Sequence, residues 1–155
     1  MSLAQRLAKD LKEFHIDGTW VSTNLNDQLA DVDWQMATKQ VYNLNSIAML
    51  SFHINYYVVA VTQVLEGGPL DAHDRFSYDL PPITNEEDWQ QLRAKVIADG
   101  EKFSEVVEKL GDENLLDDFA DAKYGNIFCN LLGNLEHSYY HLGQIVLIKK
   151  ILKQI

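Results

Sequence analysis

Residues 45–66 read NSIAMLSFHINYYVVAVTQVLE. Apolar side chains occupy nearly every face of a helix drawn through this stretch, from Ile47 near its start to Leu65 near its end. A helix that is apolar all round belongs in the interior of a protein. Gly67-Gly68-Pro69 follows directly, and such residues end helices because glycine accepts a left-handed cap and proline cannot continue the hydrogen-bond ladder. The stretch therefore predicts an interior helix.

Three further helices are predicted around it. Near the N-terminus apolar residues recur at spacings of four, four and three, at Leu3, Leu7, Leu11 and Phe14. This stripe predicts an amphipathic helix over 2–15. A third helix is predicted over 85–110, beginning with a capping box from Thr84 to Glu87. A fourth is predicted over 126–153. Four long helices without an alternating strand pattern indicate an all-α fold, a four-helix bundle.

The remaining segments are predicted to connect these helices within a single domain, residues 1–155. Residues 19–42 form a long, partly helical connection between the first two helices, and its large aromatic side chains are expected to fold back over the bundle. Residues 70–83 are expected to form a polar loop, and the acidic stretch 112–121 a solvated linker. Gly133 and Gly143 interrupt the fourth helix, which we expect to be compensated by close contact with a neighbouring backbone.

The composition narrows the classes of partner. The chain has 155 residues, with 23 acidic against 13 basic side chains and a formal charge of −10. Such a surface repels phosphate backbones and anionic lipid, so neither nucleic acid nor a membrane is the expected partner. The longest strongly apolar patch, 56–61, is far shorter than a membrane span. Cys129 is the only cysteine, which excludes an internal disulfide. We expect a soluble, cytoplasmic protein.

The histidines carry the functional signal. His137 and His141 are four residues apart, so their rings project from the same face of the fourth helix, about 6 Å apart at Cβ. His53 lies in the predicted interior helix. If the two helices are neighbours, three neutral imidazoles can hold a divalent metal with open positions left over. Spacing alone leaves the other interpretation open, in which these are core histidines that bond to carbonyls. His15 and His73 are expected to be solvated.

Two known metal motifs do not fit. A metalloprotease helix needs a glutamate directly after the first histidine, and Ser138 stands there. Glu136 precedes His137 and points to the opposite face. A di-iron bundle needs Glu-x-x-His pairs, which the sequence lacks.

The segment from Leu132 to Ile145, LGNLEHSYYHLGQI, resembles the closing helix of the DinB/YfiT-like superfamily, with its H-x-x-x-H-x-G-Q-I signature. Residues 45–57 are similar to the second helix of that family, in which a lone histidine completes a triad. The similarity extends over nearly the whole chain. Members often carry a tryptophan soon after the first histidine, whereas Tyr56 and Tyr57 stand here, so substrate identity does not carry over.

The resemblance implies a four-helix bundle, frequently a homodimer, in which three histidines hold one divalent ion, often nickel or zinc. The matching positions are His53, His137 and His141. Characterised relatives include thiol S-transferases that use bacillithiol, mycothiol or glutathione, and an isomerase dependent on such a thiol; many members have no assigned activity. The implied substrate is therefore a small molecule, such as a low-molecular-weight thiol.

From the residues, the leading hypothesis is a metalloenzyme whose ion activates a thiol or a water, giving thiol transfer or hydrolysis. Gln144 and Tyr140 are candidates for supporting the site, together with Tyr56, Tyr57 and Asn134. Cys129 is expected to project away from the histidines, and no carboxylate base is evident on their face. The alternative is a non-catalytic helical protein, with or without metal, that acts by association.

Overall fold

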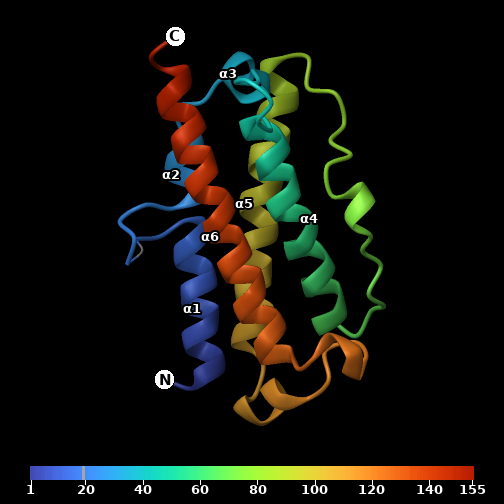
Figure 1. Ribbon diagram of the computed structural model, residues 1–155. Coiled ribbons are helices and arrows are strands. Elements are labelled where there is room, and N and C mark those ends of the chain that lie inside the picture. Colours follow the sequence, from blue (N-terminus) through green and yellow to red (C-terminus); the bar gives the residue numbers. More distant parts are fainter. Residues whose placement is uncertain (19) are drawn as a thin grey trace.

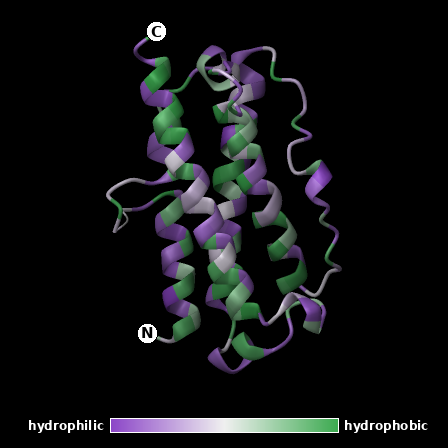
Figure 2. Ribbon diagram, in the orientation of Figure 1, coloured by the Kyte–Doolittle hydropathy of each residue, from purple (hydrophilic) through white to green (hydrophobic). Residues whose placement is uncertain are grey.

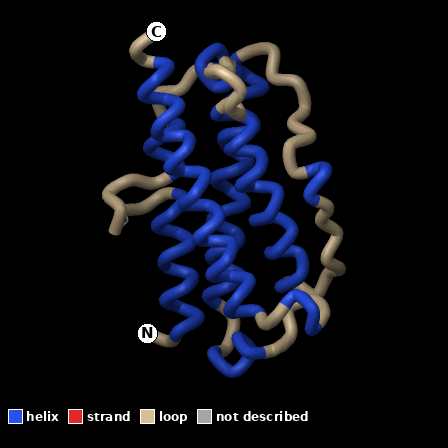
Figure 3. Tube along the Cα trace, viewed as in Figure 1, coloured by secondary structure: helices blue, strands red, loops and turns tan. Residues whose placement is uncertain are grey.

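The computed structural model describes residues 1–18 and 20–155, and the described residues are helical, with one isolated β-bridge between Asp118 and Asn126 and no strand. The all-α prediction is confirmed. Figures 1 and 3 show long helices lying side by side and joined by loops. The long helices are α1 (Leu3–His15), α4 (Ile47–Leu65), α5 (Glu86–Glu108) and α6 (Ile127–Leu152). The short ones are α2 (Leu25–Leu29), α3 (Trp34–Thr38), and the 3₁₀ turns η1 (Asp74–Phe76), η2 (Asp112–Leu116) and η3 (Ala122–Tyr124).

Each long helix begins at a side-chain cap. Ser2, Ser46 and Asn126 accept a hydrogen bond from the amide three residues on, which satisfies one of the free amides of the first turn. The cap of α5 is Asn85, which accepts from the amide of Asp88. The predicted capping box from Thr84 to Glu87 is therefore wrong. Asn85 is the cap, and the carboxylate of Asp88 accepts from the amide of Thr84, so the bonds do not form the reciprocal pair of a capping box.

Helix α5 packs against both α1 and α4, and α6 packs against α4 and α1. Hydrophobic residues recur along these helices (Figure 2), and the buried ones form one contiguous cluster. Its largest fully buried side chains include Phe14, Trp89 and Phe103. The indole of Trp89 donates to the carbonyl of Val32 at 2.7 Å, so α5 also fixes the connection between α1 and α4.

That connection contains α2 and α3, as predicted, and buries Leu25, Leu29 and Val32 against the long helices. Thr19, where the predicted connection begins, lies outside the described residues. The expectation that the aromatic side chains of the connection fold back is wrong for Trp20 and Tyr42, which are 99% and 87% exposed. Trp34 packs partly buried against the core.

The acidic stretch 112–121 is not a simple solvated linker. The carboxylate of Asp112 accepts from the amides of Leu3 and Ala4, at 3.0 and 2.8 Å, and these bonds lower its pKa. Leu115 and Phe119 are buried. The stretch thus closes the end of the molecule and caps α1 with a negative charge, which a helix N-terminus favours.

His15 was expected to be solvated, and the structure contradicts this. The residue is 1% exposed, and its Nδ1–H donates to the carbonyl of Leu11 at 2.8 Å. Burial lowers its pKa to about 4. The ring packs so closely on Gly100 that a Cβ there would collide with it. The close contact that was expected at Gly133 and Gly143 is absent, because an added Cβ at either position would meet nothing within 4 Å. The glycine in close contact is Gly100, against the ring of His15.

Helix α4 is long and apolar enough to cross a membrane by length and composition, and it is the one such helix among the described residues. The helix contains no uninterrupted apolar run of that length, because polar residues such as Ser51, His53 and Asn55 divide it. All three of these side chains are buried inside the protein. The core helix of a protein can have the same length and composition, and 56% of the apolar window of α4 is buried.

Candidate metal centre

The three predicted ligands meet between α4 and α6. His53 projects from α4, and His137 and His141 project one turn apart from α6. The Nε2 atom of His137 lies 3.0 Å from the Nε2 of His53 and 3.0 Å from the Nε2 of His141. His53 and His141 are buried, and His137 is partly exposed. Among the described residues, this is the group of nitrogen, sulfur or carboxylate ligands that could hold a metal ion.

Two of the rings have their tautomer fixed by a partner on the far side. The Nδ1 of His53 lies 3.3 Å from the carbonyl oxygen of Ser77, and the Nδ1 of His141 lies 2.7 Å from the Oε1 of Gln144. Both partners are acceptors, so each Nδ1 carries the proton and each Nε2 presents a lone pair. Metal-binding histidines have this same arrangement, with the remote nitrogen donating to a carbonyl or carboxylate.

The arrangement fits a cation. Two lone pairs face the Nε2 of His137, which has one proton at most to offer them. Burial, reinforced by the neighbouring imidazoles, lowers the pKa of His137 to about 4 and also lowers the pKa of His53, so protons do not fill the site at neutral pH. Nitrogens bound to one tetrahedral zinc at 2.0–2.1 Å stand about 3.3 Å apart. Two of the three pairs are spaced at 3.0 Å, and the three ligand atoms all lie within 4.8 Å of one another. The donor set therefore fits a divalent ion of the zinc type.

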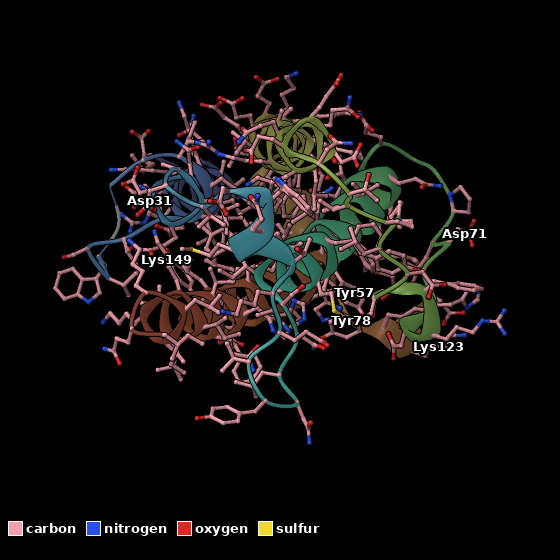
Figure 4. The ribbon with its side chains drawn as sticks, turned by 90° about the horizontal axis from the view of Figure 1, so that it is seen from above. Asp31, Tyr57, Asp71, Tyr78, Lys123 and Lys149 are labelled. Carbon is pink, nitrogen blue, oxygen red and sulfur yellow. The ribbon has the colours of Figure 1, made fainter. Side chains whose placement is uncertain are left out.

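Aromatic rings enclose the imidazoles. Tyr78 stacks on His53 with ring centroids 4.0 Å apart and planes at 6°. Tyr57 meets the rings of His53 and His137 edge-on, at 5.2 and 5.0 Å. Tyr140 packs on His141 at 4.9 Å, and its hydroxyl oxygen accepts from the amide of Gln144. Figure 4 labels Tyr57 and Tyr78, which come from different elements yet both contact His53. This packing holds the rings in place.

The segment between α4 and α5 supplies part of the site. Figure 1 shows it running back along α4. The hydroxyl of Tyr56 bonds to the backbone of His73, and the hydroxyl of Tyr57 donates to Asp74 at 2.7 Å. Burial and this bond raise the pKa of Tyr57 to about 12. These bonds attach the segment to α4 and bring Ser77 and Tyr78 against His53.

A cavity of about 320 Å³ opens beside His137. Tyr57, Asn134 and Cys129 share its lining. Cys129 was expected to project away from the histidines, but it is exposed in this cavity, two turns before His137 on α6. Eight residues turn the helix about 80° beyond two full turns, so Cys129 and His137 lie on the same side of α6, about 12 Å apart along its axis. Asn134 is 7% exposed, and its Oδ1 has no hydrogen-bond partner among the described residues.

The structure thus brings together His53, His137 and His141, with Gln144, Tyr140 and Tyr57 against them. Tyr56, on α4, instead bonds through its hydroxyl to the backbone of His73 on the connecting segment. The side chain of His73 is exposed, as expected. Sequence reasoning missed Ser77, Tyr78 and Asp74, which lie in the predicted polar loop. That polar loop has no apolar periodicity from which its contacts could be predicted. The partner of the Nδ1 of His53 is a backbone carbonyl, which every residue type carries, so the sequence does not indicate it.

Comparison of the chain with protein-family models, curated proteins and solved structures gives no match.

Proposed function

We propose that the protein is a divalent-metal enzyme of the DinB/YfiT-like kind, a four-helix bundle in which His53, His137 and His141 hold zinc or nickel. One observation carries the proposal: three imidazole Nε2 atoms converge, at 3.0 Å for two pairs, while the Nδ1 atoms of two rings face acceptors. Histidines that only pack in a core are not expected to direct their lone pairs at one point, because each lone pair would then lack a hydrogen-bond donor.

A divalent ion held by three neutral imidazoles keeps most of its charge and lowers the pKa of a thiol or water that coordinates it. The residues of the chain have supporting roles. Ser77 and Gln144 keep the Nδ1 protons of His53 and His141 in place, and Tyr78 and Tyr140 restrict the rings. The cavity beside His137 supplies the space for a small substrate.

Thiol transfer is the reaction that we propose first. The ligand-type group that includes these histidines contains no carboxylate, and Asp74 is engaged by the hydroxyl of Tyr57. Hydrolysis by an activated water is usually assisted by such a base, whereas a thiolate attacks an electrophile unaided. The proposed substrates are therefore a low-molecular-weight thiol and an electrophilic partner. In line with the resemblance, we also propose a cytoplasmic homodimer.

Metal analysis tests the proposal directly. Protein purified without a metal-affinity column is expected to contain close to one equivalent of a transition metal, and to lose thermal stability on chelation, because a bound ion stabilises the native state by mass action. His137→Ala and His141→Ala should each remove the ion. His73→Ala is the matched control, since its exposed ring contacts none of the three histidines, and it should retain the metal.

The activity is then measured with bacillithiol, mycothiol, glutathione and coenzyme A against monochlorobimane. The expected result is conjugate formation with one of these thiols that chelation abolishes. Less than a tenth of an equivalent of any transition metal, with melting unchanged by chelation, contradicts the metal centre. Metal without any thiol-dependent rate contradicts the transferase and leaves hydrolysis or a non-catalytic role.

A further inference from the structure

The outer side of α6 carries one exposed stripe along the helix. Its residues are exposed and recur at alternating spacings of three and four: Gly133, Glu136, Tyr140, Gly143, Leu147 and Lys150. This period of 3.5 residues keeps the positions on one line and is typical of a helix that packs against one other helix. Figure 1 shows α6 at the front of the bundle with no other helix in front of it. The helix that this spacing fits is therefore not in the described part of the chain.

The middle of the stripe is apolar. Tyr140 is 65% exposed, and Leu147, two turns later, is 57% exposed. A hollow of about 260 Å³ lies beside Leu147, and Leu44 and Gln144 share its lining. Large apolar side chains that gather on one exposed face mark interaction sites. The stripe thus offers a projecting ring and, one heptad later, a hollow.

Gly143 lies between Tyr140 and Leu147 and leaves the backbone of α6 open at that point. A Cβ added there would meet nothing within 4 Å. Glycine inside a helix costs stability relative to alanine, and no close contact among the described residues accounts for it here. Because a missing side chain lets a second backbone approach closely, this is the point of the stripe at which another helix can come nearest.

The two charges of the stripe lie symmetrically about Gly143, with Glu136 seven residues before it and Lys150 seven residues after it. Neither forms an ion pair with another described residue. In a two-fold antiparallel pair of α6 helices centred near Gly143, residues equally far from the centre on opposite sides meet. Glu136 then meets the partner's Lys150, and Tyr140 meets the partner's Leu147. A parallel pair would instead place like charges together.

We propose that this stripe is the interface of the homodimer, in which α6 of two copies packs antiparallel and crosses at Gly143. The ring of Tyr140 enters the hollow beside the partner's Leu147, and two pairs of Glu136 with the partner's Lys150 flank the contact. The inference rests on the proposed function only for the existence of a dimer. The contact also reaches the metal centre, because Tyr140 packs on His141.

Charge reversal tests the pairing. Sedimentation equilibrium of the full-length protein at low ionic strength gives the Kd of the dimer, and metal content is measured on the same samples. Glu136→Lys alone, or Lys150→Glu alone, places like charges opposite each other at both pairs, so each variant should raise the Kd at least about tenfold. A one-to-one mixture of the two variants pairs opposite charges again and should return to within threefold of the parent.

Glu105→Lys and Lys109→Glu are the matched controls, because they make the same charge changes at exposed positions of α5. Each should leave the Kd within threefold of the parent. Gly143→Gln, which places a long uncharged side chain at the crossing point, should raise the Kd at least about tenfold.

A protein that is monomeric at all concentrations overturns the proposal. A dimer whose Kd is unchanged in both charge variants, or as weakened in the α5 controls, refutes this interface and leaves the dimer itself standing. A mixture that stays as weak as the single variants refutes the antiparallel pairing. Since none of these outcomes depends on the metal content, failure of the interface is distinguished from failure of the metal centre.

Discussion

Gln144 offers the sharpest test of how the chain prepares the three imidazoles. Its Oε1 lies 2.7 Å from the Nδ1 of His141, the shorter of the two bonds that fix the tautomers. Gln144→Leu keeps the size and helical preference of the side chain but removes the acceptor. His141 then loses its reason to keep the proton on Nδ1 and can rotate about its Cβ–Cγ bond.

The expected effect is a loss of metal affinity without loss of the fold. Removing such a partner typically weakens metal binding about 10–100-fold, which corresponds to about 1.4–2.7 kcal/mol. Gln144 is only partly buried, so a water can replace its oxygen in the variant. We therefore expect the low end, about tenfold. Tyr140→Phe should change the affinity less than about threefold, because the tyrosine hydroxyl reaches His141 only through the longer 3.3 Å bond from Gln144.

Zinc affinity is measured by competition with a chromophoric chelator, and the fold by thermal melting of the metal-free protein. Gln90→Leu is the control: the same substitution on exposed helical surface of α5, where the side chain bonds only to Glu86. A Gln144→Leu protein that binds zinc within twofold of the parent would refute the orienting role. Equal weakening by Gln90→Leu would show that the effect is not specific to His141.

Three further outcomes are expected. The pKa of His15 falls from about 6.5 when unfolded to about 4 when folded, so the unfolded state binds the proton more readily and stability is lost as pH falls from 6.5 towards 4. In urea titrations with EDTA, the loss of stability between pH 7.5 and 4.5 should be about 2–3 kcal/mol smaller in His15→Leu than in the parent. Equal losses would contradict the burial of a neutral ring. Gly100→Ala should lower the melting temperature, because its Cβ meets the ring of His15. The Cβ of Gly133→Ala meets nothing within 4 Å, so this variant should gain up to about 1 kcal/mol of folding stability. A stabilised Gly100→Ala protein together with a destabilised Gly133→Ala protein would refute the packing. Analytical ultracentrifugation should show a dimer, and Leu147→Glu should weaken it, since Leu147 is 57% exposed on α6. A monomer at all protein concentrations would contradict the proposed dimer.

The long helices were predictable because their signals are local. The stripe from Leu3 to Phe14 and the apolar run of 45–66 depend only on spacing, and the observed boundaries differ from the predicted ones by two residues or fewer. The spacing of His137 and His141 likewise placed two rings on one face. What spacing could not supply was the meeting of these rings with His53, which depends on how two helices far apart in the sequence pack. That step rested on the resemblance.

The errors have a common physical origin. His15, Asp112 and Cys129 were interpreted from their own neighbours in the sequence, whereas their surroundings come from other elements. Gly100 makes room for the ring of His15, and the N-terminus of α1 supplies the donors for Asp112. Ser77 and Tyr78 were missed for the same reason. A polar loop has no periodicity, so the bonds that attach it to α4 leave no pattern in its sequence.

The buried polar side chains of α4 fall into two groups, those that bond within the helix and those that bond to groups outside it. Ser51 and Thr62 donate to carbonyls one turn back in their own helix, at 2.9 and 2.7 Å, so each is satisfied without help and can serve packing alone. His53 and Asn55 are buried to a similar degree but depend on groups outside the helix, namely Ser77 and Asp99. Each also keeps one atom whose requirement the described residues do not properly meet: a lone pair of His53 that faces other imidazoles, and the Oδ1 of Asn55. An unmet polar atom in the interior costs free energy, and the Nε2 of His15 and the Oδ1 of Asn134 show that the described part of the chain carries such atoms elsewhere as well. What distinguishes His53 is that its unmet lone pair faces other imidazoles, an arrangement that a shared cation relieves.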